Sequence, residues 1–315
     1  MAVTRLTARD AALLPWIDAL ESVIFGKREV LTLAVACLLA EGHLLLEDVP
    51  GTGKTTLARA LAKSIGAQFR RVQFTSDLLP SDVLGVAVWS AERSAFVFKP
   101  GPIFANVVLA DELNRTPPRT QSALLECMSE AQVSIEGVTK ALPRPFFVIA
   151  TQNPLEFEGT YPLPESQLDR FLMRVSLGFA AREEELRILR SRATADPLER
   201  LEPVLDIAAL PEWIARTRAV RVDDALLGYL VALGHATRES GRFVHGASTR
   251  ALLGLQRAAQ ALAVLDGRTF VVPDDVKAVA VPVLAHRLMP ASEANDRDDS
   301  ETLVRQLLDE LPVPR

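Results

Sequence analysis

The sequence has few cysteines and histidines, and this shortage argues against two kinds of site. Its 315 residues include two cysteines, Cys37 and Cys127, each in apolar and helix-like surroundings. A domain held together by disulfides has more cysteines in a shorter chain, so we expect both thiols to be reduced core residues. The four histidines are widely spaced and no Cys-x-x-Cys pair occurs, so a zinc site built by the protein is not expected.

Long apolar runs are also missing. The longest one, residues 30–40, is about half of the ~20 residues that a membrane-spanning helix needs, and a glutamate lies on each side of it. The N-terminus lacks the basic and then apolar layout of a secretory signal. We therefore expect a cytoplasmic protein without a membrane span.

Positive charge is not in excess. The chain has 35 Lys and Arg against 40 Asp and Glu, which gives a net charge of -5. Binding to nucleic acid needs a basic face, so this balance argues against nucleic acid as a partner. Hydrophobic residues make up 49% of the chain but aromatic residues only 6%, which predicts a mainly aliphatic core. The length is sufficient for two domains.

Hydrophobic periodicity predicts an α/β domain at the start of the chain. Residues 10–39 have the apolar spacing of a helix, and Gly42 ends this stretch. Short apolar runs typical of buried strands then alternate with helical patterns, at 43–46, 69–74, 106–110, 146–150 and 174–177. This alternation predicts a mostly parallel sheet with helices on both faces.

Two hairpins interrupt this pattern, and the strands stop after Gly178. The hairpins are expected at 86–98 and at 133–142, the second with its turn at Glu136 and Gly137. Residues 193–203 are expected to form a linker, and helices broken by proline and glycine follow. We predict an α/β core with an N-terminal helix over residues 1–192, and the linker with a helical domain over residues 193–315.

A glycine-rich loop between the first strand and the next helix predicts a phosphate site. The glycines let the backbone approach phosphate oxygens, and the helix N-terminus offers free N–H groups. Lys54 would neutralise the β- and γ-phosphates, and Thr55 would bind Mg²⁺. A strict phosphate loop has glycine at position 48, where this chain has aspartate. The residues expected to contact nucleotide are Asp48, Val49, Pro50, Gly51, Thr52, Gly53, Lys54, Thr55 and Thr56.

Two acidic residues at the end of a later strand indicate that this site hydrolyses its nucleotide. Residues 107–110 are apolar, and Asp111 and Glu112 follow them directly. Asp111 is placed to hold Mg²⁺ through water, and Glu112 is placed to polarise the attacking water. We therefore expect ATP or ADP with Mg²⁺ as the ligands, and Thr55 and Asp111 as the residues that hold the metal.

Three further polar residues have both a catalytic and a structural interpretation. Asn153 ends another buried strand, where its amide can contact the γ-phosphate and the water, or can simply make an Asn-Pro turn. Arg170 and Arg250 can stabilise charge on the transferred phosphoryl group. Either arginine can instead form a surface salt bridge, for instance between Arg170 and Asp169 or Glu165.

These motifs and their neighbours resemble the MoxR family of AAA+ ATPases. The likeness is close over residues 42–177 and weaker over residues 246–250 and 267–288. The segments that carry it are 44–56, 73–82 (Gln-Phe-Thr-Ser-Asp-Leu-Leu-Pro-Ser-Asp), 101–106, 109–115 (Leu-Ala-Asp-Glu-Leu-Asn-Arg), 150–171, 272–276 and 283–287 (Val-Leu-Ala-His-Arg).

The resemblance implies roles that spacing does not show. Lys54 and Thr55 would belong to Walker A, Asp111 and Glu112 to Walker B, and Asn153 would be sensor 1. Arg170 would be an arginine finger acting on the ATP of a neighbouring subunit, and Arg250 would be sensor 2 of a helical lid. The hairpins would be the helix-2 insert and the pre-sensor-1 hairpin.

The family also implies an assembly and a task. Its members form ring-shaped homo-oligomers, usually hexamers, and remodel client proteins in maturation or in cofactor and metal insertion. They often act beside a protein with a von Willebrand factor A domain. Two positions depart from the family pattern: Thr249 replaces a proline before Arg250, and Lys27, next to Gly26 near the expected adenine site, replaces a glutamine.

Other functions remain open on the sequence alone. One is a nucleotide-gated scaffold with little hydrolysis, although Glu112 and Asn153 argue against it. Another is an AAA+ motor on nucleic acid, which the negative net charge disfavours. A third is a metal-chelatase subunit, although the segments 152–154 and 159–165 are more similar to the MoxR family.

Overall fold

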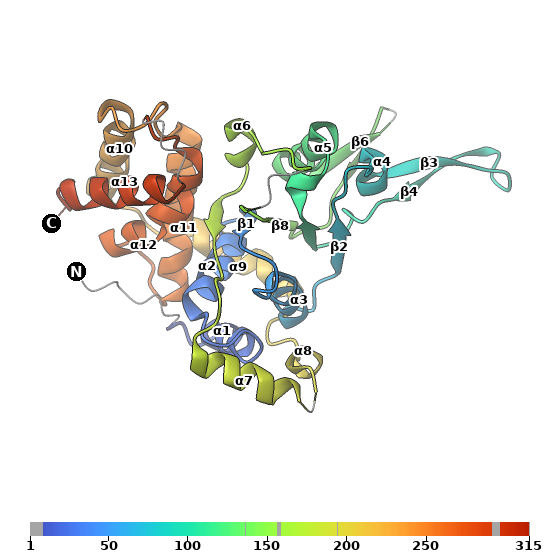
Figure 1. Cartoon of the computed structure of the whole chain (residues 1–315), viewed down its shortest axis with the longest axis horizontal. Helices are drawn as coiled ribbons and strands as arrows, with labels where there is room; N and C mark the ends of the chain where they lie inside the picture. Colours follow the sequence, from blue (N-terminus) through green and yellow to red (C-terminus); the bar gives the residue numbers. More distant parts are fainter. Residues whose placement is uncertain (1–8, 136, 156–158, 194, 292–296, 315) are drawn as a thin grey trace.

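A five-stranded parallel sheet lies at the centre of the first domain (Figure 1). The computed structural model describes residues 9–135, 137–155, 159–193, 195–291 and 297–314. The sheet has the order β2-β5-β8-β1-β9, with all neighbouring pairs parallel. Its strands are β1 (Leu44–Glu47), β2 (Phe69–Gln73), β5 (Val107–Asp111), β8 (Phe147–Gln152) and β9 (Met173–Val175). The predicted parallel sheet is therefore confirmed, with strand ends shifted by one or two residues.

Helices cover both faces of this sheet, because strand residues alternate between two cores. Leu44, Leu46 and Leu109 pack into a core with α1, α2 and α3, whereas Leu45 and Val108 face a second core with α5. The helices of this domain are α1 (Leu14–Glu21), α2 (Arg28–Leu39), α3 (Lys54–Ser64), α4 (Pro80–Leu84), the 3-10 helix η1 (Leu113–Arg115), α5 (Pro118–Glu130), α6 (Glu165–Leu168) and α7 (Arg182–Arg192). Cys37 and Cys127 are buried free thiols, one in each core, as predicted.

The prediction of one helical stretch over residues 10–39 was wrong. The chain forms two helices there, because α1 ends at Glu21 and α2 begins at Arg28. Gly26 lies in the connection with a φ of +68°, a backbone conformation that favours glycine and interrupts a helix. This break matters for the site, because the connection forms part of the cavity described below.

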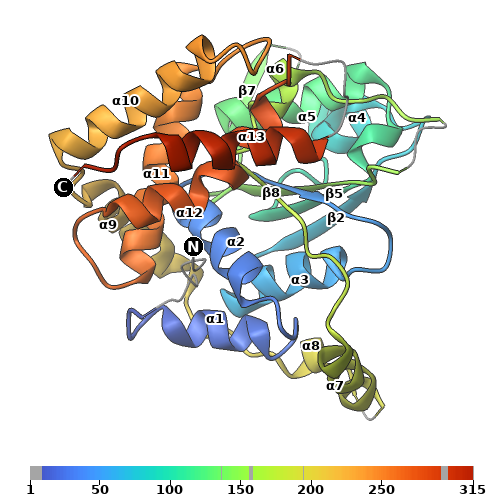
Figure 2. The same cartoon turned by 60° about the vertical axis from the view of Figure 1, so that its left-hand side comes forward.

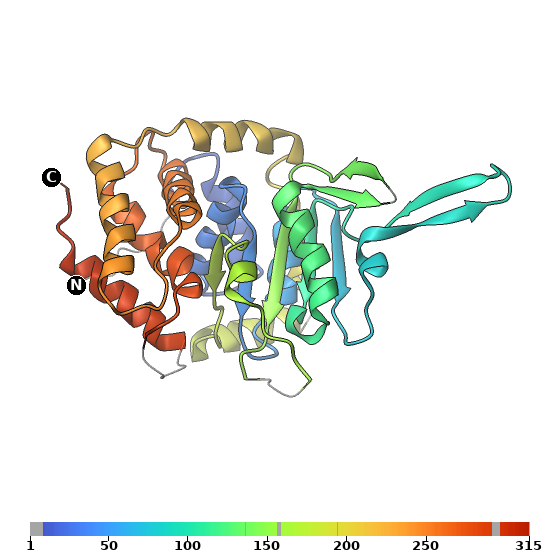
Figure 3. The same cartoon turned by 90° about the horizontal axis from the view of Figure 1, so that it is seen from above.

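Two antiparallel hairpins extend from the domain at the positions predicted. The first pairs β3 (Gly85–Ser90) with β4 (Ala95–Pro100) and projects far from the sheet (Figures 1 and 3). The second pairs β6 (Gln132–Ile135) with β7 (Val138–Ala141), and Glu136 in its predicted turn lies outside the described residues. Trp89 and Phe96 are exposed on the first hairpin and stack edge to face, with ring centroids 5.4 Å apart.

The second half of the chain is helical and packs beside the edge of the sheet that carries β9 (Figures 2 and 3). Its helices are α9 (Leu210–Ala219), α10 (Asp224–Glu239), α11 (Thr249–Leu265), α12 (Pro273–Leu284) and α13 (Arg297–Glu310), with 3-10 turns η2 (Ile207–Ala209) and η3 (Ala285–Arg287). The predicted linker 193–203 contains a short helix, α8 (Pro197–Arg200), with Asp196 as its N-cap. The boundary at residue 192 stays a prediction, since one core continues into both halves.

The described part of the chain was searched for membrane-spanning helices and for clusters of metal-binding side chains. None of its helices is both long and apolar enough to cross a membrane. Over the same residues, no three His, Cys, Asp or Glu side chains gather in the way that a metal site requires.

His43, buried directly before β1, connects α5 to the backbone of β8. Its Nε2 donates to the carbonyl of Met128 at 2.9 Å, and its Nδ1 accepts from the Val148 amide at 3.1 Å. Burial lowers the pKa of His43 to about 4, because a charged imidazole would lose its hydration there. The ring is therefore neutral in the folded protein at pH 7, with both nitrogens hydrogen-bonded.

This histidine should make the stability depend on pH. In the unfolded chain His43 takes up a proton below a pKa of about 6.5. Its stabilising contribution is thus complete above that pH and is lost as pH falls towards about 4. Between pH 7 and pH 5 the loss should be about 2 kcal/mol of unfolding free energy. Urea unfolding at both pH values should show this extra loss in the wild type and in His235→Asn, an exposed control, but not in His43→Asn. Equal losses in all three proteins would contradict the assignment.

Candidate functional site

The loop between β1 and α3 has the backbone of an anion site. Gly51 and Gly53 have φ values of +86° and +97°, which other residues adopt only with strain. No side chain caps the N-terminus of α3, so its first amide groups are directed at the loop. The Nζ of Lys54 donates to the carbonyls of Asp48 and Val49 at 2.6 and 3.0 Å, which holds the ammonium group over the loop.

Asp48, which breaks the strict phosphate-loop pattern, is directed away from the loop. It is buried, and its carboxylate accepts hydrogen bonds from Ser176 Oγ, Leu177 N and Gly178 N at 2.7, 2.5 and 3.0 Å. These donors lie directly after β9, at the start of the connection to α7. Asp48 therefore fixes the segment that encloses the far side of the cavity, and its carboxylate is not placed to contact phosphate.

Restoring the strict pattern should consequently harm this protein. Asp48→Gly would leave two amide N–H groups and one hydroxyl near the end of β9 without their acceptor. We expect a loss of about 2–4 kcal/mol in unfolding free energy, measured by urea denaturation. Asp77→Ala, at an exposed aspartate, is the control and should change stability by less than about 0.5 kcal/mol. A stability unchanged in Asp48→Gly would refute the anchoring role.

Asp111 and Glu112 lie at the end of β5, beside the loop. Asp111 Oδ1 accepts from Thr151 Oγ1 at 2.6 Å, and Glu112 N donates to the same hydroxyl at 2.9 Å. Glu112 has a φ of 56°, so its backbone is strained at the point where the strand ends. Gln73 Nε2 donates to its carboxylate at 2.7 Å, and Arg115 Nε lies 3.0 Å from the same oxygen.

Two residues of β2, Arg71 and Gln73, belong to this cluster and were not predicted. Arg71 donates from Nε and Nη2 to Asp111 Oδ2 at 3.0 and 2.7 Å, and from Nη2 to Gln73 at 2.9 Å. The register pairs Gln73 with Asp111, and strand alternation places Arg71 on the same face as Gln73. The polar alternation of β2 was a signal in the sequence, but only the strand order shows that β2 neighbours β5.

A cavity of about 820 Å³ joins these elements, a volume in the range of small-molecule sites. The loop, the strand ends and the segment after β9 all contribute to it. Its lining includes Pro50, Gly51, Thr52, Gly53, Lys54, Thr55, Thr56, Arg71, Asp111, Glu112, Thr151, Gln152 and Asn153. Partial burial lowers the pKa of Lys54, and the carboxylates of Asp48, Asp111 and Glu112 oppose this shift.

The other end of the cavity is more apolar and is closed by α7 and the connection between α1 and α2. Lys27 lines it and donates from Nζ to the carbonyl of Phe179 at 2.8 Å. Gly26 does not line the cavity, and neither do Asp48 and Val49. A side chain at Gly26 would lie 2.7 Å from Glu184 of α7, so this glycine allows α7 to approach.

Asn153 lines the cavity at the end of β8, a position that fits both the catalytic role and the Asn-Pro turn considered from the sequence. Its Oδ1 accepts from the Leu155 amide at 3.2 Å, which is the turn geometry expected of an Asn-Pro sequence. The turn holds the side chain at the edge of the cavity, so a structural and a catalytic role are compatible here.

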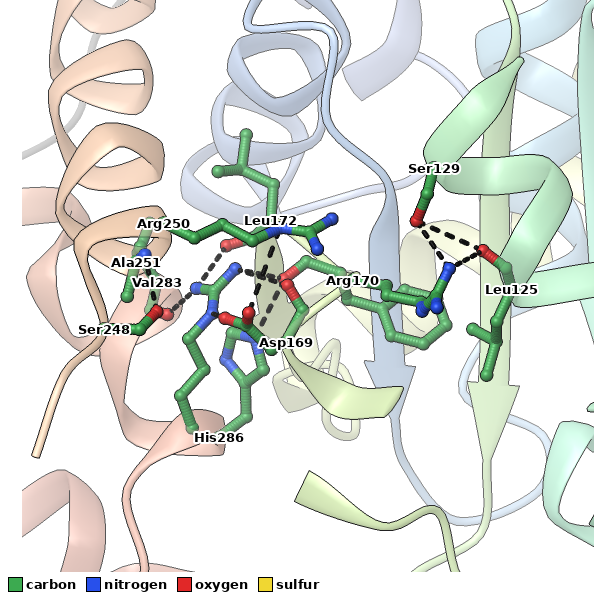
Figure 4. Close-up of polar contacts among 12 residues, drawn as sticks. Leu125, Ser129, Asp169, Arg170, Leu172, Ser248, Arg250, Ala251, Val283 and His286 are labelled. Carbon is green, nitrogen blue, oxygen red and sulfur yellow. Dashed lines mark hydrogen bonds and ion pairs between the residues drawn. The ribbon is translucent and has the colours of Figure 1, made fainter. Parts of the chain in front are cut away.

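Arg170 and Arg250 do not line this cavity; Arg250 faces Asp169, and Arg170 extends from the next residue in the other direction, towards α5 (Figure 4). Arg170 Nη1 donates to the carbonyl of Leu125 at 2.7 Å and to Ser129 Oγ at 2.6 Å. Among the described residues, no carboxylate forms an ion pair with Arg170. Arg250, in the first turn of α11, has its Nε 3.9 Å from Asp169 Oδ2 and is largely exposed.

Comparison with known proteins agrees with the division into a core and a helical lid. The model of the "ATPase family associated with various cellular activities (AAA)" matches residues 43–173. The model of the "AAA lid domain" matches residues 235–307. The matched ranges contain the glycine-rich loop and the strand-end acids in the first case, and Arg250 in the second.

Whole-length relatives are similar over nearly the entire chain. An uncharacterized protein of Bacillus subtilis, YeaC, is 48% identical over 95% of this chain and 93% of its own length. The chaperone MoxR1 of Mycobacterium tuberculosis is 40% identical over 93% of this chain and 80% of its own. The crystal structure of a candidate ATPase from Cytophaga hutchinsonii is 37% identical, with a TM-score of 0.88 over 96% of this chain and 95% of that one.

Proposed function

The chain belongs to the MoxR family of AAA+ ATPases, and we propose that it hydrolyses ATP to remodel client proteins. Hydrolysis would take place at the interfaces between the subunits of a ring-shaped homo-oligomer, which is usually a hexamer in this family. The observation that supports hydrolysis most strongly is the meeting of Lys54, Asp111 and Glu112 on one cavity. A cation for phosphate, a carboxylate for metal and a carboxylate for water are the groups that phosphoryl transfer to water needs.

The residues of the cavity fit a magnesium ion. The Thr55 hydroxyl and the Asp111 carboxylate would hold it, since Mg²⁺ prefers oxygen ligands and keeps several waters. When bound, Mg²⁺ neutralises charge on the phosphates. Arg71 supplies positive charge to Asp111 in this structure, so the two cations would compete for one carboxylate oxygen.

Glu112 is the candidate for orienting the attacking water, together with Asn153. Its side chain is about one third exposed and lines the cavity, while Gln73 and Arg115 both contact its Oε2. A carboxylate held within hydrogen-bond reach of a water can take up its proton as attack proceeds. The strained backbone at Glu112 supports a functional role, since such conformations cluster at active sites.

The placement of Arg170 and Arg250 supports a site shared between two copies of the chain. Both lie beside Asp169, outside the cavity that holds their own Lys54. In a ring, this pair would reach the nucleotide of the neighbouring subunit and stabilise charge in the transition state. In a closed ring with head-to-tail interfaces, the arginines of every subunit lie against the cavity of the next subunit, so all sites can be completed in the same way.

The relative named as a chaperone and the first hairpin support the proposal that this protein acts on client proteins. The β3–β4 hairpin carries exposed Trp89 and Phe96 away from the body of the molecule (Figure 3). Aromatic residues at an exposed tip are typical of protein contacts. We propose that this hairpin meets the client, and that a protein with a von Willebrand factor A domain is a second partner.

Assembly-dependent hydrolysis tests the proposed function. If the arginine surface of one subunit completes the site of the next, the ATPase rate per subunit should rise with protein concentration until assembly is complete. The measurement is steady-state phosphate release over a range from mainly single subunits to complete assemblies, with size followed by light scattering. A rate per subunit that is constant over this range would contradict the shared site, and no measurable release would favour a nucleotide-gated scaffold.

A further inference from the structure

Arg287 joins the helical lid to the short segment that carries Arg170. It lies in η3, directly after α12, and its side chain is only 6% exposed. Its Nε donates to Asp169 Oδ1 at 2.7 Å, Nη2 donates to the Phe171 carbonyl at 2.6 Å, and Nη1 donates to the Leu172 carbonyl at 3.2 Å. The same side chain thus contacts three of the four residues from 169 to 172.

The chemistry of this contact is specific for arginine. A buried cation is costly unless a charge partner and enough acceptors surround it, and both Asp169 and the backbone carbonyls supply them here. A lysine would keep the charge of Arg287, but its single ammonium group cannot reproduce a planar fork that bonds in several directions. The position therefore requires the hydrogen-bond geometry of arginine and not only its positive charge.

Other lid residues hold the same segment. His286 Nε2 donates to the Phe171 carbonyl at 3.0 Å (Figure 4). Leu172 packs tightly against α11, where a methyl group added to Gly254 would lie 3.0 Å from Leu172 Cδ1. A glycine inside a helix costs about 1 kcal/mol relative to alanine, so the close approach is the physical reason for Gly254. The segment is consequently attached to the lid by both polar and apolar contacts.

The opposite side of the segment carries Arg170. Asp169 and Arg170 are adjacent, yet Asp169 turns towards the lid and Arg170 towards α5 (Figure 4). The backbone that fixes Asp169 is therefore the backbone from which Arg170 extends. A displacement of this backbone would move Arg170 away from Leu125 and Ser129. Because we propose that Arg170 acts on the neighbouring subunit, such a displacement would also affect the neighbour's site.

We propose that Arg287 is a positioning residue for Arg170: it locks the segment 169–172 to the lid, so that the arginine at the subunit interface is held in place by the lid. This inference rests on the proposed role of Arg170 in the neighbour's site. It adds a residue that touches neither nucleotide nor neighbour, and it gives a task to the His-Arg pair that ends the motif at residues 283–287.

The first test is a split between catalysis and nucleotide binding. Arg287→Lys should lower kcat by about 10- to 100-fold, since small displacements of a catalytic group have effects of this size. The affinity for a fluorescent ATP analogue should stay within about twofold, because the subunit's own cavity is intact. Arg305→Lys is the matched control, a lid arginine paired with Glu301 on the surface, and it should behave as the wild type.

A double-mutant cycle then separates positioning from a general structural defect. If Arg287 acts through Arg170, Arg287→Lys should have less than about a twofold effect in the Arg170→Ala background. Single-turnover assays with labelled ATP, followed for hours, keep these slow rates measurable. Multiplicative effects of the two substitutions would overturn the inference, and so would a wild-type kcat in Arg287→Lys. A wild-type kcat in Arg170→Ala itself would instead overturn the proposed function.

Asp169→Asn provides a second route to the same answer if Arg287→Lys does not fold. It keeps the shape of the acceptor but removes the charge that Arg287 and Arg250 face. The expected result is again a lower kcat, unchanged nucleotide affinity and no further effect in an Arg170→Ala, Arg250→Ala background, which removes the effect of Asp169 on both arginines. An additive effect in that background would refute the positioning role.

Discussion

Arg170→Ala should lower the ATPase rate of the assembled protein by about 10³- to 10⁵-fold, the range measured when an arginine finger is removed. The structure gives the reason for a defect in catalysis and not in binding. Arg170 is outside its own cavity, where its present partners are the Leu125 carbonyl and Ser129, so removing it leaves the Lys54 loop intact. Nucleotide affinity should therefore stay near that of the wild type.

Steady-state phosphate release and binding of a fluorescent nucleotide measure the two quantities separately. Arg305→Ala serves as a control for the loss of one positive charge on the surface of the protein. The size of the assembly must be followed as well, because Arg170 is proposed to lie at an interface. A rate close to the wild type in a complete assembly would show that Arg170 has only the structural role of bonding α5.

Glu112→Gln should have the second largest effect, a decrease in turnover of about 10²- to 10⁴-fold, as expected when a group that takes up a proton from water is lost. Glutamine keeps the shape of the side chain and can still accept the hydrogen bond from Gln73. Folding and ATP binding should be preserved, so ATP should accumulate on the protein. Single-turnover kinetics with labelled ATP distinguish this outcome from a loss of binding.

The same variant provides a search for the client. A ring that binds ATP but hydrolyses it slowly should hold its partners long enough for them to be isolated. Lys54→Ala, which is expected to lose nucleotide binding, is the matched control for proteins that adhere without ATP. Turnover of Glu112→Gln at the wild-type rate would assign the attacking water to another residue, with Asn153 as the next candidate.

The parts of the fold that the sequence predicts are those with local signals. The strands at β1, β5 and β8 are continuous apolar runs because both of their faces are buried, and the loop before α3 is marked by its glycines. The break between α1 and α2 was missed, because the apolar spacing continues through residues 22–27. The helix stops there because Gly26 has a positive φ, and the connection that follows lines the cavity.

The site depends more strongly on contacts between distant residues. Asp48 was counted among the residues expected to contact nucleotide because of its place in the loop, but the partners of its carboxylate are Ser176 and the amides that follow it, about 130 positions away. Arg71 meets Asp111 only because β2 and β5 are neighbours in the sheet. Nothing in the local pattern of the sequence records such pairings.

The arginines illustrate the same limit. Arg170 and Arg250 are both ambiguous in the sequence, since a surface salt bridge explains either one, and Arg287 is known there only as part of the motif at residues 283–287. In the structure Arg250 and Arg287 both face Asp169, at sequence separations of up to 118 residues, and Arg170 extends from the next position in the chain. The location of Arg170 and Arg250, outside the cavity of their own subunit, turns two separate ambiguities into one proposal about an interface.

The central claim is that one ATP site is built from two subunits, and mixing two inactive variants tests it most directly. Lys54→Ala lacks a working loop but keeps Arg170, whereas Arg170→Ala keeps its loop. In a one-to-one mixed assembly, roughly a quarter of the interfaces should join an intact loop to an intact arginine. We predict that phosphate release reappears on mixing and peaks at intermediate ratios. Co-assembly of the two variants without any gain in activity would contradict the shared site.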